Sequence, residues 1–399
     1  MCGYTSSMRL IFGLLLACFG GAAASGQFEI LDGKTTASLR GIDAVSPQVA
    51  WASGSGGTVL LTTDGGANWK HCAVPPVGEK LDFRGVQGFD ATTALVMSSG
   101  TGDASRIYKT TDGCATWTLV LTNPDAPKDG FFDALIFVDR NHGLVFGDPA
   151  HGGMSNPVEG GYFAFRFRLT DDGGKTWGPV SDPEMEQAGR NLMPLAGEGG
   201  FAASNSAVAV RDGWLWFATS AARVARRRLY QDGAPMDYVF APGRCGGAID
   251  PVSMRCGIPW VDFQNSIAPM VSGPAAGIFS LHFRDAEVGV AVGGDYTKPA
   301  VPTGSAAYTR DGGLRWNKPA TLPSGYRSAV AYDAGSGVWI SLGPNGTDIS
   351  KDDGNNWAPL KPSKKDAPDA DKNWNAISLP FVVGSKGKIG KLKAGILAK

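Results

Sequence analysis

The sequence lacks the features that mark several large functional classes. Its 399 residues carry 37 basic and 37 acidic side chains, so the formal net charge is zero and nothing draws the whole chain toward nucleic acid or a membrane surface. It has no G-x-S-x-G motif, no phosphate-binding loop and no dinucleotide fingerprint. No apolar run is long enough to span a bilayer. We therefore expect no nucleic-acid partner, no membrane span and no cofactor.

One eight-residue motif is present five times. Each copy has Thr or Ser first, Asp third, Gly fourth or fifth, and Trp last, as in T-T-D-G-G-A-N-W. The copies run from Thr62 to Trp69, Thr110 to Trp117, Thr170 to Trp177, Thr309 to Trp316 and Ser350 to Trp357. The aspartate and tryptophan that recur in every copy are expected to be structural; they are Asp64, Asp112, Asp172, Asp311 and Asp352, with Trp69, Trp117, Trp177, Trp316 and Trp357.

The residue types of this motif suit a hairpin. The carboxylate can accept hydrogen bonds from backbone N–H groups two residues on, and the hydroxyl is a second local acceptor. Glycine supplies the positive φ of a tight turn, and the closing Trp can start the next strand with a large apolar face to bury. A calcium loop needs oxygens at alternate positions, a spacing that none of the copies has. We therefore expect no metal at these aspartates.

The motif resembles the Asp-box, or BNR, repeat, which implies a β-propeller blade for each copy. Box aspartates are 48 residues apart from 64 to 112, 60 from 112 to 172 and 41 from 311 to 352, near the period of one blade. The wide gap from Asp172 to Asp311 can hold a blade without a box, with strands between Phe201 and Leu229. After the last box, three strands are expected between Trp374 and Leu392, and Phe28 to Leu31 can supply the fourth. The prediction is an all-β propeller of seven four-stranded antiparallel blades, with six blades as the alternative.

The N-terminus has the pattern of an export signal. Arg9 precedes an apolar run from Leu10 to Phe19 and a stretch of small residues ending at Ser25. We expect residues 1–24 to be a signal peptide and residues 25–399 a single monomeric propeller domain with an insertion at about 230–269. The protein is then periplasmic or extracellular. A second interpretation is a lipid anchor at Cys18, because Leu15 to Cys18 is similar to a lipobox.

Four cysteines remain after the signal, namely Cys72, Cys114, Cys245 and Cys256. An even number in an exported chain favours disulfides. Cys245 and Cys256 bracket a short segment, whereas Cys72 and Cys114 lie beside boxes on adjacent predicted blades. Sequence alone leaves three connectivities open. The C-x-x-C spacing of a zinc site is absent.

Three sequence stretches outside the boxes make the resemblance more specific than the box repeat alone. They are G-F-A-A-S-N-S-A-V-A-V at 200–210, G-V-A-V-G-G-D-Y at 289–296 and P-S-G-Y-R-S-A-V-A-Y at 323–332. With the boxes, they make the chain similar to photosystem II stability/assembly factor-like propellers. That resemblance implies an exported scaffold or binding protein without known catalysis.

Three predicted innermost strands begin with an apolar or aromatic residue followed by arginine, and these arginines are Arg40, Arg84 and Arg327. If their side chains meet at one mouth of the channel, they form a site for an anion, a carboxylate or a peptide. Asp148 and Asp295 are expected at the same mouth. The alternatives are structural salt bridges, or a sialidase-like glycoside hydrolase, which needs an arginine triad and a Tyr–Glu pair. No such Tyr–Glu pair is recognisable in the sequence.

Overall fold

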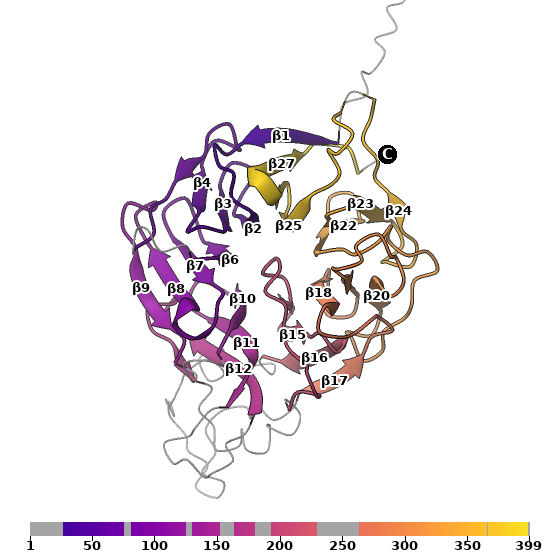
Figure 1. The fold of residues 1–399 in the computed structure, drawn as a ribbon, viewed down its shortest axis with the longest axis horizontal. Helices are drawn as coiled ribbons and strands as arrows, with labels where there is room; N and C mark the ends of the chain where they lie inside the picture. The colour runs from indigo at the N-terminus through magenta and orange to yellow at the C-terminus, as the bar shows by residue number, and fades with distance from the viewer. Residues whose placement is uncertain are drawn as a thin grey trace, which may run out of the picture.

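The computed structural model describes residues 27–75, 81–124, 130–151, 163–179, 193–229, 263–364 and 366–397. In these ranges the regular elements are strands and two short 3-10 turns, η1 (Gly102–Ala104) and η2 (Ser385–Gly387). The strands form seven antiparallel sheets arranged around a central axis (Figure 1). The seven-bladed prediction is confirmed, and the six-bladed alternative is wrong.

The first three blades follow the chain from the innermost strand outward. Blade 1 contains β2 (Leu39–Ala44), β3 (Ala50–Gly54), β4 (Val59–Thr62) and β5 (Lys70–His71); blade 2 contains β6 (Phe83–Gly88), β7 (Ala94–Ser98), β8 (Arg106–Thr110) and β9 (Thr118–Thr122); blade 3 contains β10 (Phe132–Phe137), β11 (Gly143–His151), β12 (Phe163–Thr170) and β13 (Gly178–Pro179).

The next three blades repeat the pattern. Blade 4 contains β14 (Val208–Arg211), β15 (Trp214–Ala218), β16 (Arg223–Arg228) and β17 (Gln264–Ile267); blade 5 contains β18 (Ala276–Phe283), β19 (Gly289–Asp295) and β20 (Ala306–Thr309); blade 6 contains β21 (Ala329–Asp333), β22 (Val338–Gly343), β23 (Gly346–Ser350) and β24 (Ala358–Pro359).

Blade 7 joins the two ends of the described chain. It contains β25 (Trp374–Ser378), β26 (Phe381–Gly384), β27 (Lys388–Leu392) and β1 (Phe28–Asp32), and β1 pairs antiparallel with β27 (Figure 1). The expected contribution of Phe28 to Leu31 to the last blade is therefore confirmed. Closure in this way covers the edge of β27 and ties the start of the described chain to its last blade.

Blades 4 and 5 depart from the expected pattern at their outer strands. The fourth strand of blade 4, β17, lies at the end of the segment that the sequence suggested was an insertion. In blade 5 the fourth position holds only an isolated bridge between Tyr308 and Asn317. Pro319 follows two residues later and has no N–H to donate, so a ladder cannot continue through it.

Each box forms the same hydrogen-bonded turn. In the first, Oγ1 of Thr62 accepts from the Gly66 N–H at 2.9 Å, and Oδ1 of Asp64 accepts from the Asn68 N–H at 2.9 Å. The Asp64 carboxylate thus accepts from the N–H four residues on, whereas the sequence suggested two residues on. The reason is that the Thr62 hydroxyl accepts the N–H inside the turn. These bonds hold the pKa of Asp64 at about 2, with the Asn68 N–H the largest cause.

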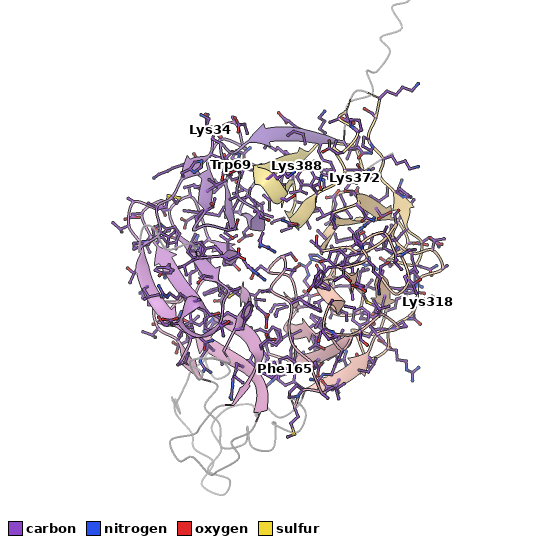
Figure 2. The ribbon with its side chains drawn as sticks, in the orientation of Figure 1. Lys34, Trp69, Phe165, Lys318, Lys372 and Lys388 are labelled. Atoms are coloured by element: carbon purple, nitrogen blue, oxygen red, sulfur yellow. A yellow bond between two sulfur atoms is a disulfide. The ribbon has the colours of Figure 1, made fainter. Side chains whose placement is uncertain are left out.

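The boxes also pack the blades against one another. Trp69, at the end of the first box, lies at the junction with blade 7, where its ring meets Phe381 edge to face at 6.0 Å (Figure 2). Cys72 and Cys114 form a disulfide between blades 1 and 2, as one of the pairings proposed from the sequence requires. Cys245 and Cys256 lie outside the described residues.

Candidate functional site

The two faces of the ring differ in what they carry. Boxes lie between the third and fourth strands of their blades, on the face that also holds the turns between the first and second strands; Gly65 of the first box donates to the Gln48 carbonyl. The opposite face, here called the mouth face, holds the turns between the second and third strands and the connections between blades. Gly57 of such a turn donates to the carbonyl of Leu81 in the connection to blade 2.

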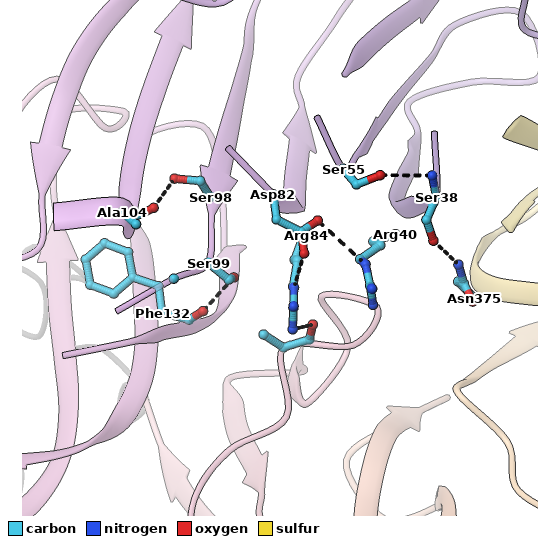
Figure 3. A network of polar contacts seen from close by, with 12 residues as sticks. Ser38, Arg40, Ser55, Asp82, Arg84, Ser98, Ser99, Ala104, Phe132 and Asn375 are labelled. Carbon is cyan, nitrogen blue, oxygen red and sulfur yellow. Dashed lines mark hydrogen bonds and ion pairs between the residues drawn. The ribbon is translucent and has the colours of Figure 1, made fainter. Parts of the chain in front are cut away.

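At the mouth face, Arg40 and Arg84 share one carboxylate. Each is the second residue of an innermost strand, β2 or β6. Nε of Arg84 donates to Oδ2 of Asp82 at 2.8 Å, and Nε of Arg40 lies 3.6 Å from Oδ1 of the same residue (Figure 3). We call Arg40 and Arg84, together with the Asp82 carboxylate that they share, the arginine pair. It carries two positive charges against one negative charge.

Arg40 is the less satisfied member of the arginine pair. Its side chain is 34% exposed, yet its Nε is buried and has no hydrogen-bond partner in the described structure. Burial lowers the pKa of its guanidinium, an effect that Asp82 opposes and that Arg84 reinforces by charge repulsion. A ligand carboxylate at the exposed part of the Arg40 side chain would relieve the repulsion between the two arginines.

Arg327 does not join them, which corrects the sequence-based grouping of three arginines. Its side chain is fully buried and donates from Nε to Oδ2 of Asp348 at 2.7 Å and from Nη1 to Oδ1 of Asn345 at 2.7 Å. The guanidinium therefore points into blade 6, toward β23, instead of toward a ligand. It has the structural salt-bridge role that the sequence left open.

The two acidic residues expected at the mouth bind local groups rather than the arginines. Asp148 accepts from the Gly200 N–H at 2.6 Å, and its carboxyl interacts electrostatically with the buried carboxyl of Asp133. Desolvation raises the pKa of both carboxyls, and the charge of Asp148 adds to the rise at Asp133. Asp295 accepts from Thr297 and lies 3.3 Å from Nζ of Lys298, which makes it the cap of a surface turn.

A segment that sequence reasoning missed crosses the channel. The central segment, Gly199–Ser206, leads into β14 at the middle of the ring (Figure 1). Its Asn205 amide bonds both the N–H and the carbonyl of Leu135 in blade 3, at 2.8 and 2.9 Å. The preceding residue, Ser204, donates to the carbonyl of Ser328 before β21 of blade 6, at 2.9 Å. Two consecutive residues thus bond blades on different sides of the axis, so the segment obstructs the channel.

The central segment also touches the arginine pair. The Ala202 carbonyl accepts from Nη1 of Arg84 at 3.2 Å. The only sequence signal was the phrase G-F-A-A-S-N-S, whose small polar side chains fit a narrow channel. That phrase was assigned to the start of a blade, and nothing in it identifies the strands with which it bonds.

An aromatic cluster stands next to this site. Phe201 of the central segment stacks on Phe279 of β18 with ring centroids 3.8 Å apart. Phe279 in turn meets Tyr326 edge to face at 4.9 Å and Tyr296 at 6.0 Å. Tyr326 is buried, and desolvation raises the pKa of its phenol, whereas Tyr296 is 50% exposed.

The sialidase constellation is not formed by the residues that the sequence suggested for it. Such catalysis needs three guanidiniums around one substrate carboxylate and a Tyr nucleophile with a Glu partner. Arg327 is buried elsewhere, and burial raises the pKa of the Tyr326 phenol, which disfavours the phenolate that a nucleophile would need. The described residues contain no cluster of three metal-ligating side chains and no helix suited to crossing a membrane.

Comparison with known proteins gives the same fold. A structure of YCF48 bound to D1 peptide matches with a TM-score of 0.57 and 14% identity, covering 93% of this chain and 98% of that one. YCF48 from Cyanidioschyzon merolae matches with a TM-score of 0.53 and 16% identity, covering 92% and 98%. No family model matches the sequence, and no curated protein matches it.

The shared fold is a seven-bladed β-propeller. YCF48 is a photosystem II assembly factor, so the resemblance to assembly factor-like propellers, stated above from the sequence, is confirmed at the level of the fold. At these identities the likeness concerns the fold alone, and the arginine pair has to be argued from its own geometry.

Proposed function

We propose that the protein is a non-catalytic binding propeller, an assembly or stability factor for exported or membrane proteins, whose mouth face binds an anionic peptide. The observation that carries this proposal is the arginine pair. Two guanidiniums, 34% and 27% exposed, share the single carboxylate of Asp82, so one positive charge is left without a counter-charge inside the arginine pair.

The ligand class follows from the chemistry of the pair. A guanidinium presents N–H donors in a planar fork that matches a carboxylate, and charge-assisted hydrogen bonds contribute about 1.5–3 kcal/mol each. Here the walls of the mouth exclude part of the solvent, which weakens screening of the charges. A peptide is the better match than a small anion because the arginine pair adjoins the backbone and side chains of the central segment, which offer further contacts to a longer ligand. The fold is shared with a YCF48 structure that contains a bound peptide, which supports this ligand class.

The setting of this function is part of the proposal. Residues 1–24 have the pattern of an export signal, so the propeller would act in the periplasm or outside the cell. The alternative is attachment through a lipidated Cys18. Mass spectrometry of the mature protein separates the two, because cleavage near Ala24 gives a soluble form and lipidation leaves Cys18 as the modified first residue.

A binding experiment with a matched control tests the function. The double variant Arg40→Ala/Arg84→Ala is compared with wild type and with Arg140→Ala, an exposed arginine that pairs with Asp90 on the face of the boxes. Fluorescence anisotropy with labelled acidic peptides, and with the same peptides carrying Asn and Gln for Asp and Glu, reports whether charge is recognised.

The expected result is binding of the acidic peptides by wild type and by Arg140→Ala, at least a tenfold loss in the double variant, and weak binding of the amide peptides. The thermal unfolding midpoint shows whether the double variant is folded. Equal binding by the folded double variant and wild type would refute the role of the arginine pair, and so would equal binding of acidic and amide peptides. A pull-down from the exported fraction with the same three proteins then isolates the natural partner.

A further inference from the structure

We propose that Tyr296, backed by Phe279, forms a second subsite of the mouth, which receives an apolar side chain of the same peptide whose carboxylate lies at the arginine pair. This inference rests on the function proposed above. It turns a general preference for anionic peptides into a two-point requirement, a carboxylate and a nearby aromatic or aliphatic side chain.

Tyr296 is set apart by its exposure. Within the described ranges it is the only aromatic side chain among the exposed large hydrophobic residues, with 50% of its surface open to solvent. Exposed aromatic rings with a fixed position are frequent anchors of peptide recognition because they bury a large area and lose little conformational entropy.

The position of this ring is fixed by its surroundings. The Tyr296 N–H donates to the Ala275 carbonyl at 3.2 Å, and the turn after it is closed by Lys298 N–H donating to the Asp295 carbonyl at 3.0 Å. The Asp295 carboxylate accepts two bonds from Thr297. The edge of the ring rests on Phe279, which is 3% exposed. The subsite is therefore built before any ligand arrives.

The aromatic cluster adjoins the arginine pair through the central segment. Phe201 stacks on Phe279, while the next residue, Ala202, accepts the N–H of Arg84. Because consecutive Cα atoms are 3.8 Å apart, the two contacts place the subsites within the reach of a few peptide residues. On the other side, Tyr326 touches Phe279 and lies close enough to Arg40 for that charge to affect the pKa of its phenol.

The charges around Tyr296 indicate what the subsite accepts. Asp295 and Lys298 form an ion pair at 3.3 Å, so the turn that carries Tyr296 places no net charge beside the ring. An apolar side chain can then be buried against the ring without desolvating a lone charge. The net positive arginine pair next to it selects a partner that also carries a carboxylate, which favours a peptide over an uncharged surface or a second copy of this neutral chain.

The test uses peptides that differ at one position. Labelled peptides with one Asp carry a single Phe at each of the four positions before it, and reference peptides carry Ala in place of the Phe or Asn in place of the Asp. The proteins are wild type, Tyr296→Ala, Tyr296→Phe and, as a matched control, Leu314→Ala, which is 51% exposed in the box on the opposite face.

We expect wild type to prefer one Phe peptide over its Ala reference by about tenfold, as an aromatic contact with burial provides. Tyr296→Ala should lose this preference and keep its affinity for the Ala peptide, while Tyr296→Phe and Leu314→Ala keep the preference. Persistence of the preference in Tyr296→Ala, or its absence in wild type, would overturn the second subsite and leave the arginine pair standing.

Two further readouts separate the alternatives. If Arg40→Ala/Arg84→Ala binds the Asp and Asn peptides as wild type does, the proposed function itself fails, whatever Tyr296 does. Sedimentation of the unliganded proteins and flotation with anionic vesicles test other occupants. Dimerisation or vesicle binding of wild type that Tyr296→Ala abolishes would overturn the peptide assignment.

Discussion

The carboxyl of Asp43 couples the stability of the ring to pH, and its effect can be calculated from the structure. Asp43 lies in β2, and its Oδ2 accepts from the Gly88 N–H at 2.7 Å and from Nε2 of Gln87 at 2.9 Å, which links the innermost strands of blades 1 and 2. Desolvation raises the pKa of Asp43 from 3.8 to about 6, against the opposing effect of the Gly88 bond.

The sign follows from proton linkage. With a folded-state pKa near 6 and an unfolded-state pKa near 3.8, the folded protein binds this proton more tightly. The free energy of unfolding therefore falls as pH rises from about 3.8 to 6, and the loss is complete above that range. At 1.36 kcal/mol for each pKa unit, the upper bound of the loss is about 3 kcal/mol.

Asp43→Asn isolates this contribution, because an amide oxygen in the place of Oδ2 can accept both bonds and does not titrate. Denaturant unfolding from pH 4 to pH 8 should give similar stabilities for wild type and variant near pH 4 and a variant more stable by up to about 3 kcal/mol at pH 7. Asp103→Asn, at a side chain 85% exposed, is the control and should follow wild type. A constant difference between Asp43→Asn and wild type across this range would refute the reasoning.

Two further changes test the packing of the blades. Cys72→Ser removes the disulfide to Cys114, 42 residues away, and the chain-entropy relation predicts a loss of about 4 kcal/mol in the free energy of unfolding. Reduced wild type should lose as much, so equal stability of oxidised and reduced wild type would contradict this prediction. Arg327→Met leaves the buried Asp348 without its arginine and should lower the free energy of unfolding by about 3–5 kcal/mol. Arg40→Ala should lower it by less than about 1 kcal/mol. Equal unfolding midpoints for the two variants would show that Arg327 is not structural.

The blade pattern could be predicted because its causes are local. A box needs only eight consecutive residues, since the hydroxyl of Thr62 and the carboxylate of Asp64 bond N–H groups within the same turn. Middle strands such as β7 are covered on both faces by neighbouring blades, so they occur in the sequence as short apolar runs. The closing strand β1 could be predicted from the number of strands, because the C-terminal end supplies only three and a blade has four.

The environment of the arginines could not be predicted in the same way. In the sequence, Arg40, Arg84 and Arg327 each follow an apolar or aromatic residue at the start of a predicted innermost strand, so the sequence does not distinguish them. Burial of one guanidinium against Asp348 depends on a carboxylate that arrives from another strand 21 residues later. No local pattern shows which side chains will lie across the sheet.

The sequence by itself determined the propeller, its favoured number of seven blades and the position of the box turns, because these depend on neighbours in the chain or on the repeat, whereas the Cys72–Cys114 pairing was one of three that the sequence allowed. Only the tertiary structure decided which arginines share Asp82, that Gly199–Ser206 closes the channel, and that Tyr296 stands beside the site. These features join residues from different blades, whose distances are set by closure of the ring rather than by any segment of the chain.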